Sequence, residues 1–116
     1  MEVKKGELYF ADLGKEKSIS NVQKGIRPCL IIQNNVGNKF SNTVIVAPLT
    51  SKIKKTDLKV HIEIKKDKNN GLIENSIVLL EQLKTIDKSS LHNKIGVINN
   101  QDLKNIDEGL KVSLAL

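Results

Sequence analysis

The chain has 116 residues, of which 28% are charged and 39% hydrophobic, and its formal net charge at pH 7 is +6. This length and mixture predict a single folded, soluble domain over residues 1–116 and exclude a disordered chain. The N-terminal residues MEVKKGELYF lack the apolar segment of a signal peptide, and no run reaches the ~18 apolar residues of a membrane span, which favours a cytoplasmic protein. The lone Cys29 lies in an apolar run, so disulfide scaffolds and zinc sites with CxxC spacing are excluded.

Apolar segments in the first half of the chain predict three strands, at Glu7–Asp12, Arg27–Gln33 and Thr43–Leu49. The second of these strands should be buried on both faces, and Pro48 should mark the end of the third strand or a sheet edge. Gly14–Lys24 is polar and aperiodic and predicts a long loop, whereas Asn34–Asn42 is rich in turn formers and predicts a connection.

The second half of the chain predicts further strands and one helix. Strands are expected at Lys59–Ile64, within Ser76–Ile86 over the letters SIVLLEQL, and at Lys94–Ile98, with a turn at Asp67–Gly71. Apolar residues three and four apart between Leu103 and Leu114 predict a C-terminal helix, with Asn99 as its N-cap. The predicted fold is α+β and mainly antiparallel β, a small barrel or half-barrel with a C-terminal helix.

The positive charge is concentrated in two of the predicted loops. Gly14–Arg27 and Ser51–Lys59 each carry four basic residues and one acidic residue, which accounts for the whole positive excess of the chain. Solvated loops collect lysine in many proteins, but two such loops lying together in space would indicate a phosphate-rich partner.

The connection Asn34–Asn42 should place its two flanking strands side by side and antiparallel. If the hairpin is centred near Asn38, the numbers of paired residues sum to about 77, so Arg27 faces Thr50. Both basic loops leave the hairpin at this end. An arginine fork matches phosphate oxygens, and a threonine hydroxyl donates to them, which predicts a site for a phosphodiester. The general base stays unassigned, with His61, His92, Asp12 and Glu16 as weak candidates.

Four segments, GELYFADL, GIRPCLIIQNN, NTVIVAPLTSK and SIVLLEQLKTID, together resemble the MazF/PemK (Kid) endoribonuclease toxins of toxin–antitoxin pairs. The resemblance runs in order along nearly the whole chain. It implies an SH3-like barrel of the CcdB/PemK type that acts as a homodimer. It also implies cleavage of single-stranded mRNA at short sequences without metal or cofactor, leaving 2′,3′-cyclic phosphate and 5′-hydroxyl ends. A cognate MazE-like antitoxin would block the RNA groove with a disordered peptide.

By the same resemblance, the catalytic arginine of the family falls on Arg27 and its catalytic threonine on Thr50. RNA contacts are expected from both basic loops and from the LLEQLKTID segment, at Ser20, Asn21, Gln23, Lys24, Lys52, Lys54, Lys55 and Gln82. Gln82 fits equally well as a hydrogen-bonding residue at the end of a strand.

Two other classes of protein remain compatible with the sequence. One is a non-enzymatic, CcdB-like toxin that binds gyrase, and the other is an SH3-like RNA-binding module without chemistry. Tyr9, Phe10 and Phe40 are the only aromatic residues, too few for the stacking platform of a general single-strand binder. We expect Tyr9 or Phe10 in the core and Phe40 packed on the hairpin loop.

Overall fold

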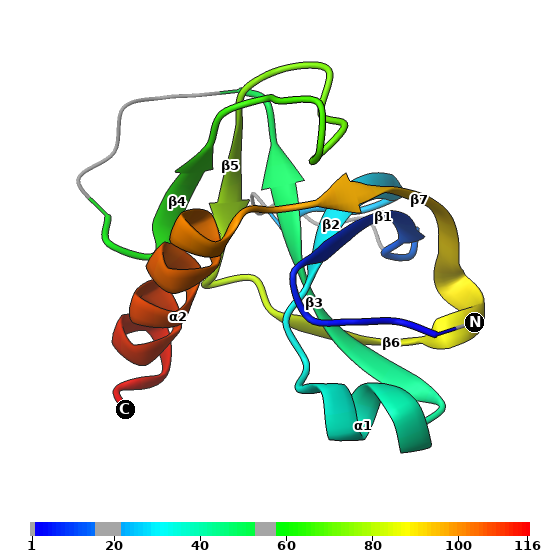
Figure 1. The fold of residues 1–116 in the computed structure, drawn as a ribbon. Coiled ribbons are helices and arrows are strands. Elements are labelled where there is room, and N and C mark those ends of the chain that lie inside the picture. The colour runs from blue at the N-terminus through cyan, green and yellow to red at the C-terminus, as the bar shows by residue number, and fades with distance from the viewer. Residues whose placement is uncertain (1, 16–21, 53–57) are drawn as a thin grey trace.

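The computed structural model describes residues 2–15, 22–52 and 58–116. This part of the chain forms one seven-stranded sheet, in which every pairing is antiparallel, and two α-helices (Figure 1). The elements are β1 (Glu7–Asp12), β2 (Ile26–Ile31), α1 (Asn35–Phe40), β3 (Thr43–Thr50), β4 (His61–Ile64), β5 (Ser76–Leu79), β6 (Lys84–Asp87), the 3₁₀ turn η1 (Lys88–Ser90), β7 (Leu91–Val97) and α2 (Asn100–Leu114). Within these ranges, neither α-helix has the length and apolar character that a membrane crossing requires.

The strands follow one another across the sheet in the order β4-β5-β3-β2-β1-β7, and β6 pairs with β3 beside this path. Within the described residues β4 and β7 stand at opposite ends of the order, so the sheet is open. The predicted antiparallel α+β fold is confirmed, in its half-barrel rather than its closed-barrel form. Each predicted strand but one corresponds to an observed strand within a few residues.

The exception is the predicted strand SIVLLEQL, which is too long: its first four residues are β5, and its last four form the turn after that strand. β5 ends at Leu79, the backbone N–H of Gln82 donates to the carbonyl of Leu79 at 3.1 Å, and β6 begins only at Lys84. β5 and β6 pair with opposite ends of β3. The turn takes up a change of register, because residue numbers paired between β3 and β5 sum to 127 and those paired between β3 and β6 sum to 130.

The core lies on both faces of β2. Cys29 and Ile31 pack in one apolar cluster, whereas Leu30 packs in a second cluster that includes Ile106 of α2. This double burial explains the continuous apolar letters of the strand and confirms the prediction. The N-cap prediction is also confirmed, because the Asn99 side chain accepts a hydrogen bond from the backbone N–H of Asp102 at 2.7 Å.

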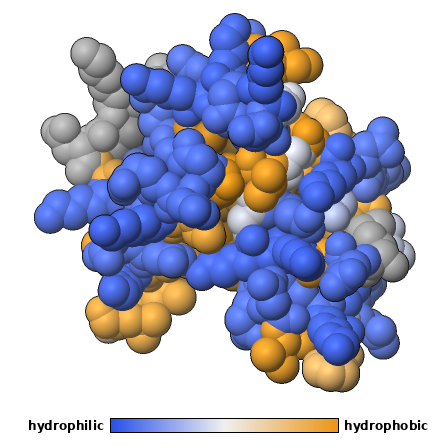
Figure 2. Space-filling view, viewed as in Figure 1, coloured by the Kyte–Doolittle hydropathy of each residue, from blue (hydrophilic) through white to orange (hydrophobic). Residues whose placement is uncertain are grey.

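The connection between β2 and β3 contains a short helix, α1. This helix was not predicted, because its residues are typical of turns. Asn34 caps α1 by accepting from the backbone N–H of Gly37 at 2.8 Å. Phe40 is 77% exposed, so its predicted packing on the loop is wrong, while Tyr9 is buried as expected. Figure 2 shows hydrophobic groups at the lower edge of a mostly hydrophilic face, where Figure 1 places α1.

The predicted turn at Asp67–Gly71 is present and packs tightly on β7. The buried Asn70 side chain accepts from the backbone N–H groups of Asp67 and Leu72 and donates to the carbonyl of Lys65. Gly71 has φ +66°, and a Cβ added there would lie 2.3 Å from the carbonyl oxygen of Ile95. Only glycine therefore allows this loop to approach β7 so closely.

We expect Gly71→Ala to lower the free energy of unfolding by about 3 kcal/mol, because it adds a backbone clash to the cost of a left-handed alanine. Gly25→Ala is the matched control: Gly25 has φ +75°, but a Cβ there meets nothing within 4 Å. It should cost only about 1 kcal/mol. Urea unfolding of both variants measures the difference, and equal losses would contradict the close packing of this loop on β7.

Candidate functional site

The register of β2 and β3 places Arg27 and Thr50 at one site. The observed pairs are Cys29 with Pro48, Leu30 with Ala47 and Ile31 with Val46, and each pair sums to 77 as predicted. The pairing of β3 with β2 ends at Pro48, and Leu49 and Thr50 pair with β5 on the other edge of β3. Arg27 and Thr50 then line the same pocket.

This Arg27–Thr50 pocket has a volume of about 190 Å³ and is largely polar. Its walls come from the end of the first loop, the start of β2, the end of β3 and the start of β5. The lining residues are Gln23, Arg27, Pro28, Leu49, Thr50, Ser51, Lys52 and Ser76. Two cations and three hydroxyl groups thus surround a volume that would hold a small anionic group.

Local hydrogen bonds orient the two central side chains. The Nε–H of Arg27 donates to the carbonyl of Lys24 at 3.1 Å, which fixes the plane of the guanidinium and leaves its terminal NH₂ groups for another acceptor. Thr50 Oγ1 accepts from the backbone N–H of Lys52 at 3.2 Å, which leaves its hydroxyl proton to donate. Both residues therefore present donors that suit the oxygens of a phosphate.

Hydrogen bonds also close the base of the first loop. The N–H of Gly25 donates to the carbonyl of Gly14 at 2.8 Å, and the N–H of Leu13 donates to the carbonyl of Gly25 at 2.9 Å. The Gln82 side chain accepts from the backbone N–H of Gln23 at 2.9 Å. Gln82 does not itself line the Arg27–Thr50 pocket, so in this structure it positions Gln23, which does.

The structure places the other predicted RNA-binding residues differently. Lys52 lines the pocket, whereas Lys24 contributes its carbonyl to Arg27 and is not among the lining residues. Ser20, Asn21, Lys54 and Lys55 lie outside the described residues.

None of the weak candidates for a general base that the structure describes lines the Arg27–Thr50 pocket. Asp12 accepts from the N–H of Gly14 at 2.9 Å and borders a separate depression. His61 pairs with Glu81, and His92 lies exposed on β7. Glu16 falls outside the described residues. The described chain therefore supplies donors and positive charge to the pocket, but no histidine or carboxylate.

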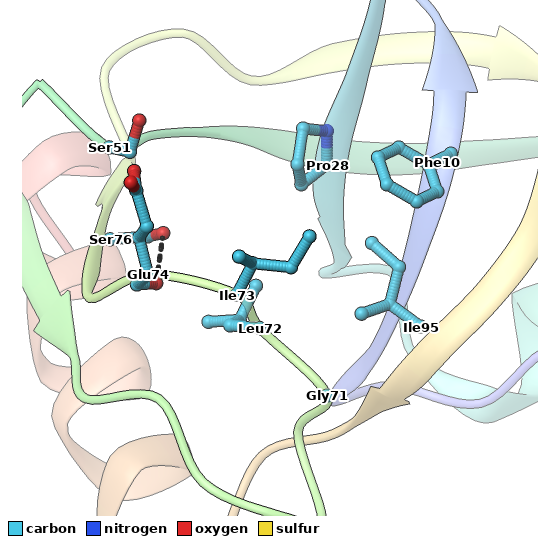
Figure 3. Close-up of a pocket in the computed structure, with 9 residues that line it drawn as sticks. All are labelled: Phe10, Pro28, Ser51, Gly71, Leu72, Ile73, Glu74, Ser76 and Ile95. Carbon is cyan, nitrogen blue, oxygen red and sulfur yellow. Dashed lines mark hydrogen bonds between the residues drawn. The ribbon is translucent and has the colours of Figure 1, made fainter.

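A second, largely apolar pocket of about 390 Å³ adjoins the first and was not anticipated from the sequence. The two pockets share Pro28, Ser51 and Ser76. Figure 3 shows Phe10 and Ile95 on one side of this apolar pocket, Ser51, Glu74 and Ser76 on the other, and Leu72 and Ile73 between them. The one available signal was the pair of apolar residues Leu72 and Ile73 in the otherwise turn-like letters NNGLIENS.

An open antiparallel sheet with a terminal helix, carrying an arginine, a lysine and a threonine around one pocket, defines a small β-domain with a cationic pocket at a strand end. The chain belongs to the PemK-like, MazF-like toxins of type II toxin–antitoxin systems, because the model of that family matches residues 4–114. It is 46% identical over 116 residues to the endoribonuclease EndoA of Bacillus subtilis (strain 168), covering 100% of this chain and 97% of that protein.

Solved structures share the fold at lower identity. The endoribonuclease of a mycobacterial species, solved in complex with its cognate antitoxin, superposes with a TM-score of 0.78 at 22% identity and covers 98% of this chain and 96% of its own. MazF from Deinococcus radiodurans gives a TM-score of 0.79 at 18% identity and covers 100% and 99%. The open sheet with its C-terminal helix is therefore the fold of MazF toxins.

Cys29 lies two residues from Arg27 but is built into the core. Its thiol is fully buried and donates to the carbonyl of Arg27 at 3.5 Å. Burial raises the pKa of Cys29 to about 12, so the reactive thiolate is scarce at neutral pH. Cys29 is therefore a packing residue rather than a nucleophile.

We expect iodoacetamide to alkylate Cys29 very slowly in the folded protein at about pH 8 and rapidly in concentrated urea, where the thiol regains an ordinary pKa of about 8.5. Mass spectrometry of timed, quenched samples measures both rates. Equal rates in the two solutions would show that the thiol is accessible in the native state.

Proposed function

We propose that this protein is a sequence-specific, metal-independent endoribonuclease that cleaves single-stranded RNA, with Arg27 and Thr50 holding the scissile phosphate. The observation that carries the proposal is the Arg27–Thr50 pocket, where a fixed guanidinium, a threonine hydroxyl and Lys52 line one small volume. Membership of the MazF-like toxin family and 46% identity to a protein named an endoribonuclease support it.

The chemistry that this pocket suits is attack within the RNA strand itself. The 2′-oxygen attacks the adjacent phosphorus in line, the bond from phosphorus to the 5′-oxygen breaks, and a 2′,3′-cyclic phosphate and a 5′-hydroxyl result. The 2′-hydroxyl loses a proton to a base, and the departing 5′-oxygen gains one. Arg27 donates to the non-bridging oxygens, whose negative charge grows in the transition state, and Thr50 donates a further hydrogen bond.

We also propose that the protein acts on mRNA in the cytoplasm as a homodimer, and that a MazE-like antitoxin inhibits it. The mycobacterial endoribonuclease with the same fold was solved with its cognate antitoxin, and a MazE–MazF structure from Deinococcus radiodurans also shares the fold. The positive charge of the chain suits both RNA and an acidic peptide, because either would replace counterions at the basic residues.

The alternatives from the sequence make different predictions for one assay. A gyrase-binding toxin would leave RNA intact, and a simple RNA-binding module would bind without cutting. The assay incubates the protein with a pool of single-stranded RNAs of varied sequence in excess EDTA and identifies the new ends. Cyclic phosphate and 5′-hydroxyl ends support the nuclease, whereas intact RNA across the pool would overturn it.

We expect Arg27→Ala to lower the cleavage rate by about 10²-fold or more, because it removes a donor that acts in the transition state. Arg27→Lys should recover only part of the rate, since an ammonium keeps the charge but not the fork. Single-turnover cleavage of a defined RNA measures these rates. Lys39→Ala, which removes an exposed cation on α1, is the control and should cleave like the unmodified protein.

At Thr50, two variants test the role of the hydroxyl group in the same assay. Thr50→Ser keeps the hydroxyl and should retain most of the cleavage rate, while Thr50→Ala removes the hydroxyl and should cleave far more slowly. A wild-type rate in Thr50→Ala or in Arg27→Ala would remove that residue from the catalytic assignment.

We expect the basic residues of the second loop to contribute mainly to affinity. Neutralising Lys52, Lys54 and Lys55 together should weaken RNA binding and flatten its dependence on salt, by roughly one unit of slope for each phosphate that a lysine no longer neutralises. Fluorescence anisotropy at several salt concentrations measures the slope. The matched control neutralises Lys39 and Lys104, two exposed lysines on α1 and α2. An unchanged slope in the loop variant would show that the lysines of this loop do not neutralise RNA phosphates.

A further inference from the structure

Two side chains at the start of β6 and in the turn before it contact both chain segments at the base of the first loop. The side chain of Gln82 accepts from the backbone N–H of Gln23, on the segment that returns to β2, at 2.9 Å. The ammonium group of Lys84 donates to the carbonyl of Leu13, on the outgoing segment that follows β1. A Cβ added at Gly14, the next residue of the outgoing segment, would lie 3.7 Å from the Lys84 nitrogen. The loop is therefore held on both sides at its base.

The part of the chain that carries these two side chains is itself fixed. Leu80 is fully buried, its backbone N–H donates to the carbonyl of Val60 at 3.0 Å, and its carbonyl accepts from the hydroxyl of Ser113 on α2 at 2.9 Å. Lys84 pairs with Val46 in the antiparallel pairing of β6 and β3. The contacts to the first loop thus start from a support that belongs to the core and the sheet.

The two held segments meet beside the residue that orients Arg27. Gly25 forms two backbone hydrogen bonds with the outgoing segment, at 2.8 and 2.9 Å. Lys24 therefore stands between two residues whose backbones are held, Gln23 and Gly25. The carbonyl of Lys24 is the acceptor for the Nε–H of Arg27 at 3.1 Å. A shift of the outgoing segment would move Gly25, and with it the carbonyl that sets the plane of the guanidinium.

We propose that Lys84 is a positioning residue for Arg27. By holding the carbonyl of Leu13, it keeps the Lys24 carbonyl where it orients the guanidinium toward the scissile phosphate. This inference rests on the proposed nuclease function and adds to it a residue that acts through the first loop. Lys84 is not among the described residues that line the Arg27–Thr50 pocket, and it borders a separate depression.

The physical reason is that a small displacement of a reacting group is costly, whereas the contact that prevents it is weak. A misplacement of about 1 Å can lower a rate by about 10²-fold, because the reaction depends on precise orientation. Lys84 is an exposed residue and belongs to neither apolar core cluster. Removing its ammonium group should therefore alter the position of the loop base while leaving the fold intact.

The first test compares two substitutions of Lys84 on an RNA whose sequence is taken from the cuts in a random pool. Lys84→Met keeps most of the apolar stem and removes the donor. We expect it to lower kcat by about tenfold and to change KM little, because orientation acts in the transition state. Lys84→Arg keeps a charged donor and should retain most of kcat. Lys104→Met, which replaces an exposed lysine on α2, is the matched control and should cleave normally.

A double-mutant cycle tests whether Lys84 acts through Arg27. Arg27→Lys removes the Nε–H that uses the Lys24 carbonyl, so the link from Lys84 ends at a missing donor. In that background Lys84→Met should lower the single-turnover rate by less than about twofold. Equal losses from Lys84→Met in the two backgrounds would overturn the positioning role.

Salt dependence separates positioning from direct contact with RNA. Lys84→Met should leave the slope of RNA affinity against salt unchanged in fluorescence anisotropy. A slope reduced by about one unit would assign Lys84 to an RNA phosphate instead and would overturn the proposal.

Hydrogen exchange measured by NMR tests the contact without RNA. In Lys84→Met the backbone N–H groups of Leu13 and Gly25 should exchange about fivefold faster, the scale of losing one hydrogen bond. The N–H of Ile106, which is buried in α2, should exchange at an unchanged rate and shows that the fold is intact. Unchanged exchange at Leu13 and Gly25 would show that Lys84 does not hold the loop base.

The outcomes keep this inference distinct from the proposed function. No RNA cleavage by the unmodified protein would overturn the proposed function and this role with it. RNA cleavage that Lys84→Met leaves at the normal rate would overturn only the positioning role.

Discussion

The site depends on the point at which the pairing of β2 with β3 ends. β3 pairs with β2 up to Pro48 and with β5 from Leu49 onward. Proline has no backbone N–H to donate, so it fits the point where one ladder ends. Because no pair of β2 with β3 is formed beyond Pro48, Arg27 and Thr50 lie past the end of this ladder, where they line one pocket. If the ladder continued in the same register, Arg27 would pair with Thr50, because paired residue numbers in this ladder sum to 77.

Two features hold Arg27 in place, one at its backbone and one at the end of its side chain. Pro28 restricts the backbone of Arg27 to extended conformations, and the buried residues from Cys29 onward anchor the strand. At the other end of the side chain, the carbonyl of Lys24 holds the guanidinium through Nε. Little conformational freedom is then left to lose when an anion binds. This matters because a reaction within the RNA strand gains most from donors that are already in place.

Much of the fold and the centre of the site could be predicted from the sequence. The register of β2 and β3 was predicted from the length of the connection between them. The register is as predicted although the connection forms α1, whose caps at Asn34 and Ser41 lie close to the ends of the two strands. The SIVLLEQL turn was missed because Leu80 is as apolar as a strand residue: it is fully buried and packs against α2 near Gly109. Periodicity cannot distinguish a buried turn from a buried strand.

The apolar pocket escaped prediction for a different physical reason. Its walls depend on the bulge at Ile95 and on the close approach of Gly71, and neither leaves a pattern in the letters because both arise from contacts between residues far apart in the chain.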